Sequence, residues 1–180
     1  MRHDKKRWTM ILKFRMLSDE NDNFVRDFEV EHDMTLAQFH NFIIEALEYD
    51  DCMASFFAAD ARWNRGREFT LMDMGEGVGS VSDGGDAPMT MDSVTLAQLA
   101  VAECNRLIYQ FDMFADRAYY IELVNASEPN PELTYPRVAF ENAPTPDQYE
   151  AGHSDEGSIF DEMMDEFDDF EGDDSYDDEY

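Results

Sequence analysis

The chain has 180 residues, of which 43% are hydrophobic, and its formal net charge is −29 at pH 7. This length fits one domain of about 150 residues followed by a tail, and the apolar content excludes a chain that is disordered throughout. So negative a charge disfavours direct nucleic-acid binding by the whole surface, since phosphates would be repelled, and it favours a basic protein partner.

The N-terminus has no apolar run long enough for a signal peptide, because Lys13 and Arg15 interrupt the only candidate. No window of the sequence approaches the length of a membrane span. The two cysteines, Cys52 and Cys104, lie too far apart for a paired metal motif and are too few for a disulfide scaffold. We therefore expect a cytoplasmic protein with reduced thiols and no membrane contact.

Basic residues gather in two groups. The first lies near the N-terminus, and the second is formed by Arg62, Arg65 and Arg67. Either these are solvated charges on strands and turns, or they form a dock for an anion, which could be the chain's own acidic tail. We expect nucleic acid to bind, if at all, only through the N-terminal group. The residues of that candidate basic dock are Lys5, Lys6, Arg7, Lys13 and Arg15.

Apolar and polar residues alternate over residues 8–16, where Trp8, Leu12 and Phe14 lie on the apolar face. Period-two alternation among residues that favour strands predicts a half-buried strand. Residues 18–23 are Ser, Asp, Glu and Asn, a composition typical of a turn. Residues 24–30 are therefore expected to form a second strand that pairs with the first as a hairpin.

The same four residues, Thr-Leu-Ala-Gln, occur at positions 35–38 and 95–98. In each copy the Thr is a suitable N-cap, and the Gln three residues later completes a capping box. The first copy predicts a helix with the apolar stripe Leu36, Phe39, Ile43 and Leu47, and the second predicts a shorter helix that ends near residue 102. The copies mark either a duplicated βα unit or a favourable helix start used twice, and their flanking sequences match too poorly to establish a repeat.

Four further stretches have the composition of strands, namely residues 53–59, 67–72, 107–111 and 119–124, and a last extended segment lies near Val138. Trp63–Gly66 is expected to be the turn between the first two. The order of elements predicts an α+β fold, a single compact domain with a largely antiparallel sheet and two main helices. We expect this domain to occupy residues 1–150 and to be followed by a disordered acidic tail, residues 151–180.

No motif typical of a catalytic or metal site is present among the four histidines and two cysteines. Asp50, Asp51, Asp112 and Asp116 could ligate a hard cation if the fold brought roughly six or more oxygens together. In a chain with 42 acidic residues, however, such pairs arise by chance. We therefore expect no enzyme activity, no cofactor and no metal.

The acidic tail contains fourteen Asp or Glu residues and no Lys or Arg, yet it also contains large apolar side chains at helical spacing. Ser158 can cap a helix over residues 158–170. Because the helix is short and carries like-charged pairs, it is marginal in isolation. The tail is therefore either a solubilising segment with incidental apolar residues or a recognition segment that becomes helical on a partner. The candidate partner-binding residues are Phe160, Met163, Met164, Phe167 and Phe170.

Residues 35–57 resemble the plasmid pRiA open-reading-frame-three-like family, in which a Thr-Leu-x-x-Leu-His helix precedes an aromatic-Asp-Asp step and a strand. The matching positions include Thr35, His40 and Tyr49, and later blocks follow in the family's order at residues 92–99, 109–123 and 135–137. The resemblance spans roughly residues 8–148. It implies one compact α+β domain, in a family that is often linked to mobile elements and has no settled activity.

The chain departs from the family's pattern where members commonly carry His, Asp and Trp, although Asp112 and Asp116 are retained. The departing positions are Met53, Ser55, Met113, Phe114, Ala115, Arg117 and Tyr119. The resemblance therefore implies a divergent member with an added acidic tail, which keeps the scaffold and has moved its function to a surface and to that tail.

Three functions are compatible with these features. The first, which we favour, is a non-enzymatic binding or adaptor protein whose acidic amphipathic tail engages a basic partner protein. The second is an auto-inhibited binder of anions or nucleic acid, in which the tail masks the basic N-terminal strand. The third is a degenerate metal-dependent enzyme that uses the aspartates at positions 50, 51, 112 and 116 as ligands.

Overall fold

The computed structural model describes residues 8–73 and 87–149. In chain order, the elements are β1 (Ile11–Ser18), β2 (Val25–Glu31), α1 (Leu36–Leu47), β3 (Ser55–Ala59), β4 (Arg65–Thr70), β5 (Met89–Thr90), the 3-10 turn η1 (Met91–Ser93), α2 (Leu96–Val101), β6 (Arg106–Asp112), β7 (Arg117–Ser127) and β8 (Arg137–Asn142).

Within these ranges the strands form one sheet in the order β5-β4-β3-β6-β7-β1-β2-β8. Every neighbouring pair is antiparallel except β4 and β5, which are parallel. β1 and β2 form the predicted hairpin, and β6 and β7 form a second one. The structure thus confirms an α+β domain with a largely antiparallel sheet and two main helices.

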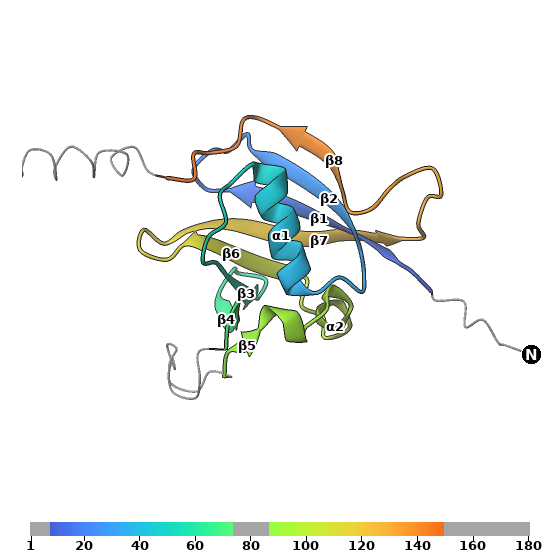
Figure 1. The fold of residues 1–180 in the computed structure, drawn as a ribbon, viewed down its shortest axis with the longest axis horizontal. Helices are drawn as coiled ribbons and strands as arrows, with labels where there is room; N and C mark the ends of the chain where they lie inside the picture. Colours follow the sequence, from blue (N-terminus) through green and yellow to red (C-terminus); the bar gives the residue numbers. More distant parts are fainter. Residues whose placement is uncertain (1–7, 74–86, 150–180) are drawn as a thin grey trace, which may run out of the picture. The chain divides into compact units, whose positions relative to one another are not determined.

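Helix α1 lies across one face of the sheet, in front of the strands in Figure 1. It buries the predicted stripe of Leu36, Phe39, Ile43 and Leu47. The ring of Phe39 stacks on that of Phe56 from β3, with 5.8 Å between the ring centroids. Fully burying a side chain of this size stabilises a fold by about 1.5–3 kcal/mol, so this stripe fixes which side of α1 faces the sheet.

Both predicted capping boxes are present, and the two helix starts also contact each other. The hydroxyls of Thr35 and Thr95 each accept a hydrogen bond at 3.2 Å from the amide three residues later. The amide of Leu36 donates to a carbonyl just before α2, and that of Leu96 to a carbonyl just before α1, at 3.0 and 2.9 Å. The repeated sequence therefore caps each helix and also joins α1 to α2.

The turn between β3 and β4 differs from the prediction. It lies at residues 60–64, earlier than Trp63–Gly66, because the Asp60 carboxylate accepts from the backbone amides of Arg62 and Asn64 at 2.8 and 2.9 Å. These bonds close the turn and allow β4 to begin at Arg65. The two-residue strand β5 and the turn η1 were not predicted, since segments this short carry no periodic pattern.

Candidate functional site

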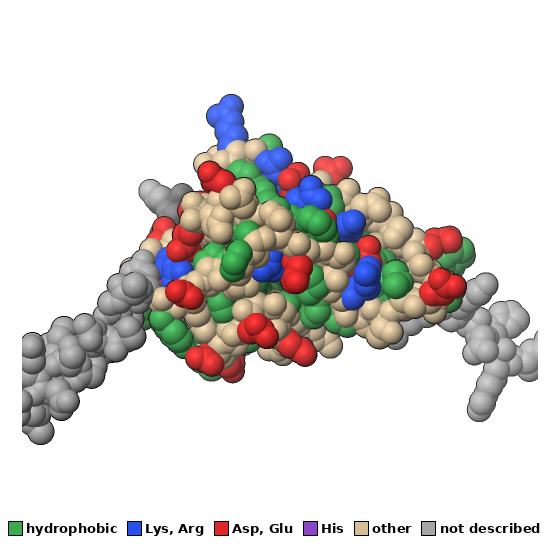
Figure 2. Space-filling view, turned by 90° about the horizontal axis from the view of Figure 1, so that it is seen from above, with side chains coloured by type: hydrophobic (Ala, Val, Ile, Leu, Met, Phe, Trp, Pro, Cys, Tyr) green, Lys and Arg blue, Asp and Glu red, His purple; other side chains and the backbone are tan. Residues whose placement is uncertain are grey.

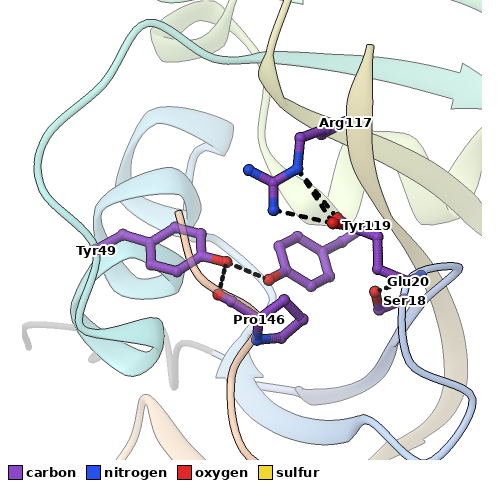
Figure 3. Close-up of polar contacts among 6 residues, drawn as sticks. All are labelled: Ser18, Glu20, Tyr49, Arg117, Tyr119 and Pro146. Carbon is purple, nitrogen blue, oxygen red and sulfur yellow. Dashed lines mark hydrogen bonds and ion pairs between the residues drawn. The ribbon is translucent and has the colours of Figure 1, made fainter. Parts of the chain in front are cut away.

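Two tyrosines connect the end of α1 with the start of β7 and with the segment that follows β8 (Figure 3). Tyr49 comes directly after Glu48, whose left-handed backbone (φ 57°) ends α1. The Tyr49 hydroxyl donates to the Pro146 carbonyl at 2.6 Å. Because a hydroxyl has one hydrogen, Tyr49 must accept from Tyr119, whose hydroxyl lies 2.5 Å away. A hydrogen-bond chain therefore runs from β7 through Tyr49 to Pro146.

Burial governs the chemistry of the phenols in this region. It raises the pKa of Tyr119, and it also raises the pKa of Tyr109 on β6. A phenol with a raised pKa stays protonated at neutral pH, so it can donate a hydrogen bond but cannot act as a general base. The raised pKa therefore leaves Tyr119 protonated and able to donate to Tyr49.

An ion pair lies beside these phenols in Figure 3. The Arg117 guanidinium, with 8% of the side chain exposed, donates to the Glu20 carboxylate at 3.0 Å and lies 4.9 Å from the centroid of the Phe111 ring. The Glu20 amide in turn donates to the Ser18 hydroxyl at 3.0 Å. These contacts hold the turn between β1 and β2 against the start of β7.

A second buried arginine holds the segment after β8. Arg26 on β2 is 5% exposed, and its guanidinium donates to the carbonyls of Asn142 and Ala143 at 2.9 Å. It also donates to the Thr145 hydroxyl at 3.1 Å. Together with the bond from Tyr49, these contacts anchor residues 142–146 to the sheet and to the end of α1.

His40 is buried on α1, with 1% of its surface exposed. Its Nδ1 lies 2.8 Å from the Tyr109 hydroxyl, whereas its Nε2 has no hydrogen-bond partner among the described residues. The nearest charge to Nε2 is the Asp51 carboxylate, at 3.8 Å. Burial lowers the pKa of His40, and the negative charge of Asp51 offsets part of that effect. His40 is therefore neutral at pH 7.

Two residues of the predicted basic dock, Lys13 and Arg15, lie on β1. Strand alternation places them on the face of the sheet opposite α1, because Phe14 between them is buried in the core. Arg15 donates to both oxygens of Asp27 at 2.8 and 2.9 Å, and Lys13 stands opposite Glu29 in the register with β2. The other three dock residues, Lys5, Lys6 and Arg7, lie outside the described residues.

The same sheet face carries a ladder of alternating charge. Arg106 on β6 is opposite Glu122 on β7, Glu122 is opposite Arg15 on β1, and Arg15 is opposite Asp27 on β2. Opposite charges in directly facing positions contribute about 0.2–1 kcal/mol each. Seen from above the view of Figure 1, as in Figure 2, Lys and Arg side chains are likewise interspersed with Asp and Glu. On β1, Arg15 is therefore paired with a carboxylate of its own sheet, and Lys13 lies opposite Glu29.

The aspartates considered as cation ligands make contacts with other groups. Asp112 accepts from two backbone amides in the turn between β6 and β7, and Asp116 forms an ion pair with Arg65 at 2.7 Å. Asp51 lies near His40, as described above. Across residues 8–73 and 87–149, no group of three or more His, Cys, Asp or Glu side chains could hold a metal ion.

The predicted helical segment, residues 158–170, lies outside the described residues, and so do all of its candidate partner-binding side chains: Phe160, Met163, Met164, Phe167 and Phe170. The anchors of residues 142–146 were not predicted. The available signal was the pair Arg26 and Asp27, two adjacent charges in a strand whose successive side chains face opposite sides of the sheet. Such a pair places one charge on the core face, where it needs partners.

The fold and these contacts define an α+β domain built around an eight-stranded sheet, in which buried polar groups serve to anchor the chain. The chain belongs to the plasmid pRiA4b ORF-3-like protein family, whose model matches residues 11–171. The motifs indicated a resemblance that ends near residue 148. The family match extends further, to residue 171, and so includes most of the acidic tail.

Among solved structures, the chain is similar to that of MM3350, a protein of unknown function from Methanosarcina mazei Go1. The TM-score is 0.64 at 12% sequence identity, over 92% of this chain and 85% of that chain. At this identity the likeness shows the fold alone. No curated protein matches the chain. Among the described helices, none has the length and apolar character needed to cross a membrane.

Proposed function

We propose that this protein is a non-enzymatic binding protein whose acidic tail, residues 151–180, engages a basic partner protein. The observation that carries the proposal is the anchoring of residues 142–146 by Arg26 and Tyr49. This anchoring holds the chain to the folded domain a few residues before the acidic tail. The domain is then the carrier, and the tail is the recognition element.

The chemistry of the tail defines the kind of partner. Its carboxylates suit a surface rich in Lys and Arg, and its Phe and Met residues at helical spacing suit an apolar groove within that surface. Attraction between exposed charges is screened over about 8 Å at physiological ionic strength, whereas apolar contacts are not weakened by salt. Added salt should therefore weaken the interaction without abolishing it.

The test compares the full chain with a chain that ends at residue 154 as baits for capturing proteins from a cell extract. We expect the full chain to retain a basic protein that the shorter chain loses. The thermal midpoint of the shorter chain should stay close to that of the full chain, because the described anchors end at Pro146. Capture of the same proteins by both baits would show that residues 155–180 are not needed for binding and would contradict the proposal.

A further inference from the structure

His40 is a buried titratable group that takes no part in anchoring residues 142–146. His40 extends from α1 with its Nδ1 against the Tyr109 hydroxyl on β6, at 2.8 Å. Its Nε2 points to the connection between α1 and β3, where the Asp51 carboxylate oxygen is 3.8 Å away. This separation is within range of an ion pair but too long for a hydrogen bond.

The neutral imidazole cannot satisfy both of its ring nitrogens in this position. If Tyr109 donates to Nδ1, the hydrogen on Nε2 has no acceptor within hydrogen-bond distance. If Nδ1 donates to Tyr109, Nε2 is an acceptor that no described donor reaches. The protonated imidazolium donates from both nitrogens, to Tyr109 and, after a small approach, to Asp51. Both ring nitrogens of His40 can therefore have hydrogen-bond partners only when the imidazole is protonated.

We propose that protonation of His40 draws Asp51 against α1, so that the connection between α1 and β3 takes different positions at neutral and at acidic pH. Asp51 can move because its side chain is 92% exposed and because no helix or strand lies between Leu47 and Ser55. Tyr49, two residues before Asp51, holds the Pro146 carbonyl. The movement therefore reaches the anchor of the C-terminal segment. This inference stands independently of the proposed binding function.

The titratable groups around His40 come from β6 and from the connection itself. Tyr109 on β6 stays neutral, since burial raises its pKa, and Cys52 and Tyr49 on the connection act on Tyr109. Asp51 is the charged group that acts on His40. Because burial is the largest effect on the pKa of His40 and lowers it from 6.5, the change in position should occur below pH 6.5.

The experiment is an NMR titration of the imidazole and backbone amide resonances of the full chain, from about pH 8 to about pH 5. In the wild type, the amides of residues 49–52 should follow the titration of His40. Asp51→Asn should lower the pKa of His40, because it removes the charge that favours the imidazolium. In this variant the amides of residues 49–52 should no longer follow His40.

Glu48→Gln is the matched control, since it removes an equal charge from an exposed position three residues before Asp51. It should leave the pKa of His40 unchanged. His40→Gln assigns the His40 resonance and should abolish the pH response of residues 49–52. The Asp51 variant keeps the test decisive even if His40→Gln folds poorly, because Asp51 is exposed. An unchanged His40 pKa in Asp51→Asn, or wild-type amides of residues 49–52 that do not follow His40, would overturn the proposal.

Discussion

At the scale of single residues, the side chains of Arg26 and Tyr49 hold the C-terminal end of the domain by hydrogen bonds to backbone carbonyls. Arg26 is buried, and its guanidinium donates to the carbonyls of Asn142 at the end of β8 and of Ala143 just after it. A hydrogen bond to a charged donor contributes about 1.5–3 kcal/mol, so loss of the guanidinium should be measurable. The two side chains therefore add to the strand pairing of Asn142 with Val25 in holding residues 142–146.

Arg26→Met tests this role, because methionine keeps much of the apolar stem but removes every donor. We expect the free energy of unfolding to fall by about 2–4 kcal/mol in a urea titration. The control is Arg62→Met in the exposed turn between β3 and β4, which should change that free energy by no more than about 0.5 kcal/mol. Equal effects at the two positions would refute the anchoring role of Arg26.

The hydrogen-bond chain from Tyr119 through Tyr49 to Pro146 predicts which tyrosine substitution lowers the free energy of unfolding more. Tyr49→Phe removes the donor to Pro146 and the acceptor for Tyr119, so it should cost about 1–3 kcal/mol of unfolding free energy. Tyr119→Phe removes one donor and leaves the bond to Pro146 intact, so it should cost less. The double variant should cost less than the sum of the two single variants, since both remove the same bond. The reverse order, measured by urea unfolding, would contradict the assigned donor directions.

At the scale of elements, the sequence predicted best where a pattern repeats along the chain. The stripe of α1 and both capping boxes were predicted from residue spacing and are present. The predicted position of the turn before β4 was wrong, because the Asp60 side chain decides which of two neighbouring turns forms. The contact between the two helix starts could not be predicted either, because spacing within a helix carries no information on which other segment it meets.

Because the starts of α1 and α2 are joined by backbone hydrogen bonds, we expect the two N-caps to be energetically coupled. Thr35→Ala and Thr95→Ala should each lower the free energy of unfolding by about 1 kcal/mol, the usual effect of losing an N-cap side chain. Because the backbone of each helix start also bonds to the other, the double variant should deviate from the sum of the single variants. Strict additivity in chemical unfolding would show that the two starts are energetically independent. Ser93→Ala, in the turn η1 before α2, is a control that leaves both caps intact.

At the scale of the whole molecule, composition and element order predicted the α+β class, and the order of the motifs predicted the family. The polar contacts among Tyr49, Tyr119 and Pro146 could not be predicted. They join positions about 70 and 97 residues apart, and only the folded sheet brings them together. The sequence-based proposal of a basic dock also did not foresee that Lys13 and Arg15 face carboxylates on neighbouring strands. Pairing across strands depends on register, which the charges alone do not specify.

This pairing bears on nucleic-acid binding. Removing residues 155–180 should leave Arg15 paired with Asp27, so we expect no gain of salt-sensitive binding to DNA or RNA through β1. Fluorescence anisotropy with a labelled oligonucleotide, at low and at physiological salt, measures this directly. A clear gain in affinity on truncation at residue 154 would favour the auto-inhibited binder instead.

The central claim is that the apolar face of the acidic tail carries recognition. The most direct measurement is the affinity of the captured partner, once purified, for a full-length variant in which Phe160, Met163, Phe167 and Phe170 are replaced by Ser. This variant keeps every carboxylate, so it separates recognition from charge. We predict that the affinity falls at least about tenfold, which corresponds to about 1.4 kcal/mol. An affinity equal to that of the unmodified chain would contradict the account.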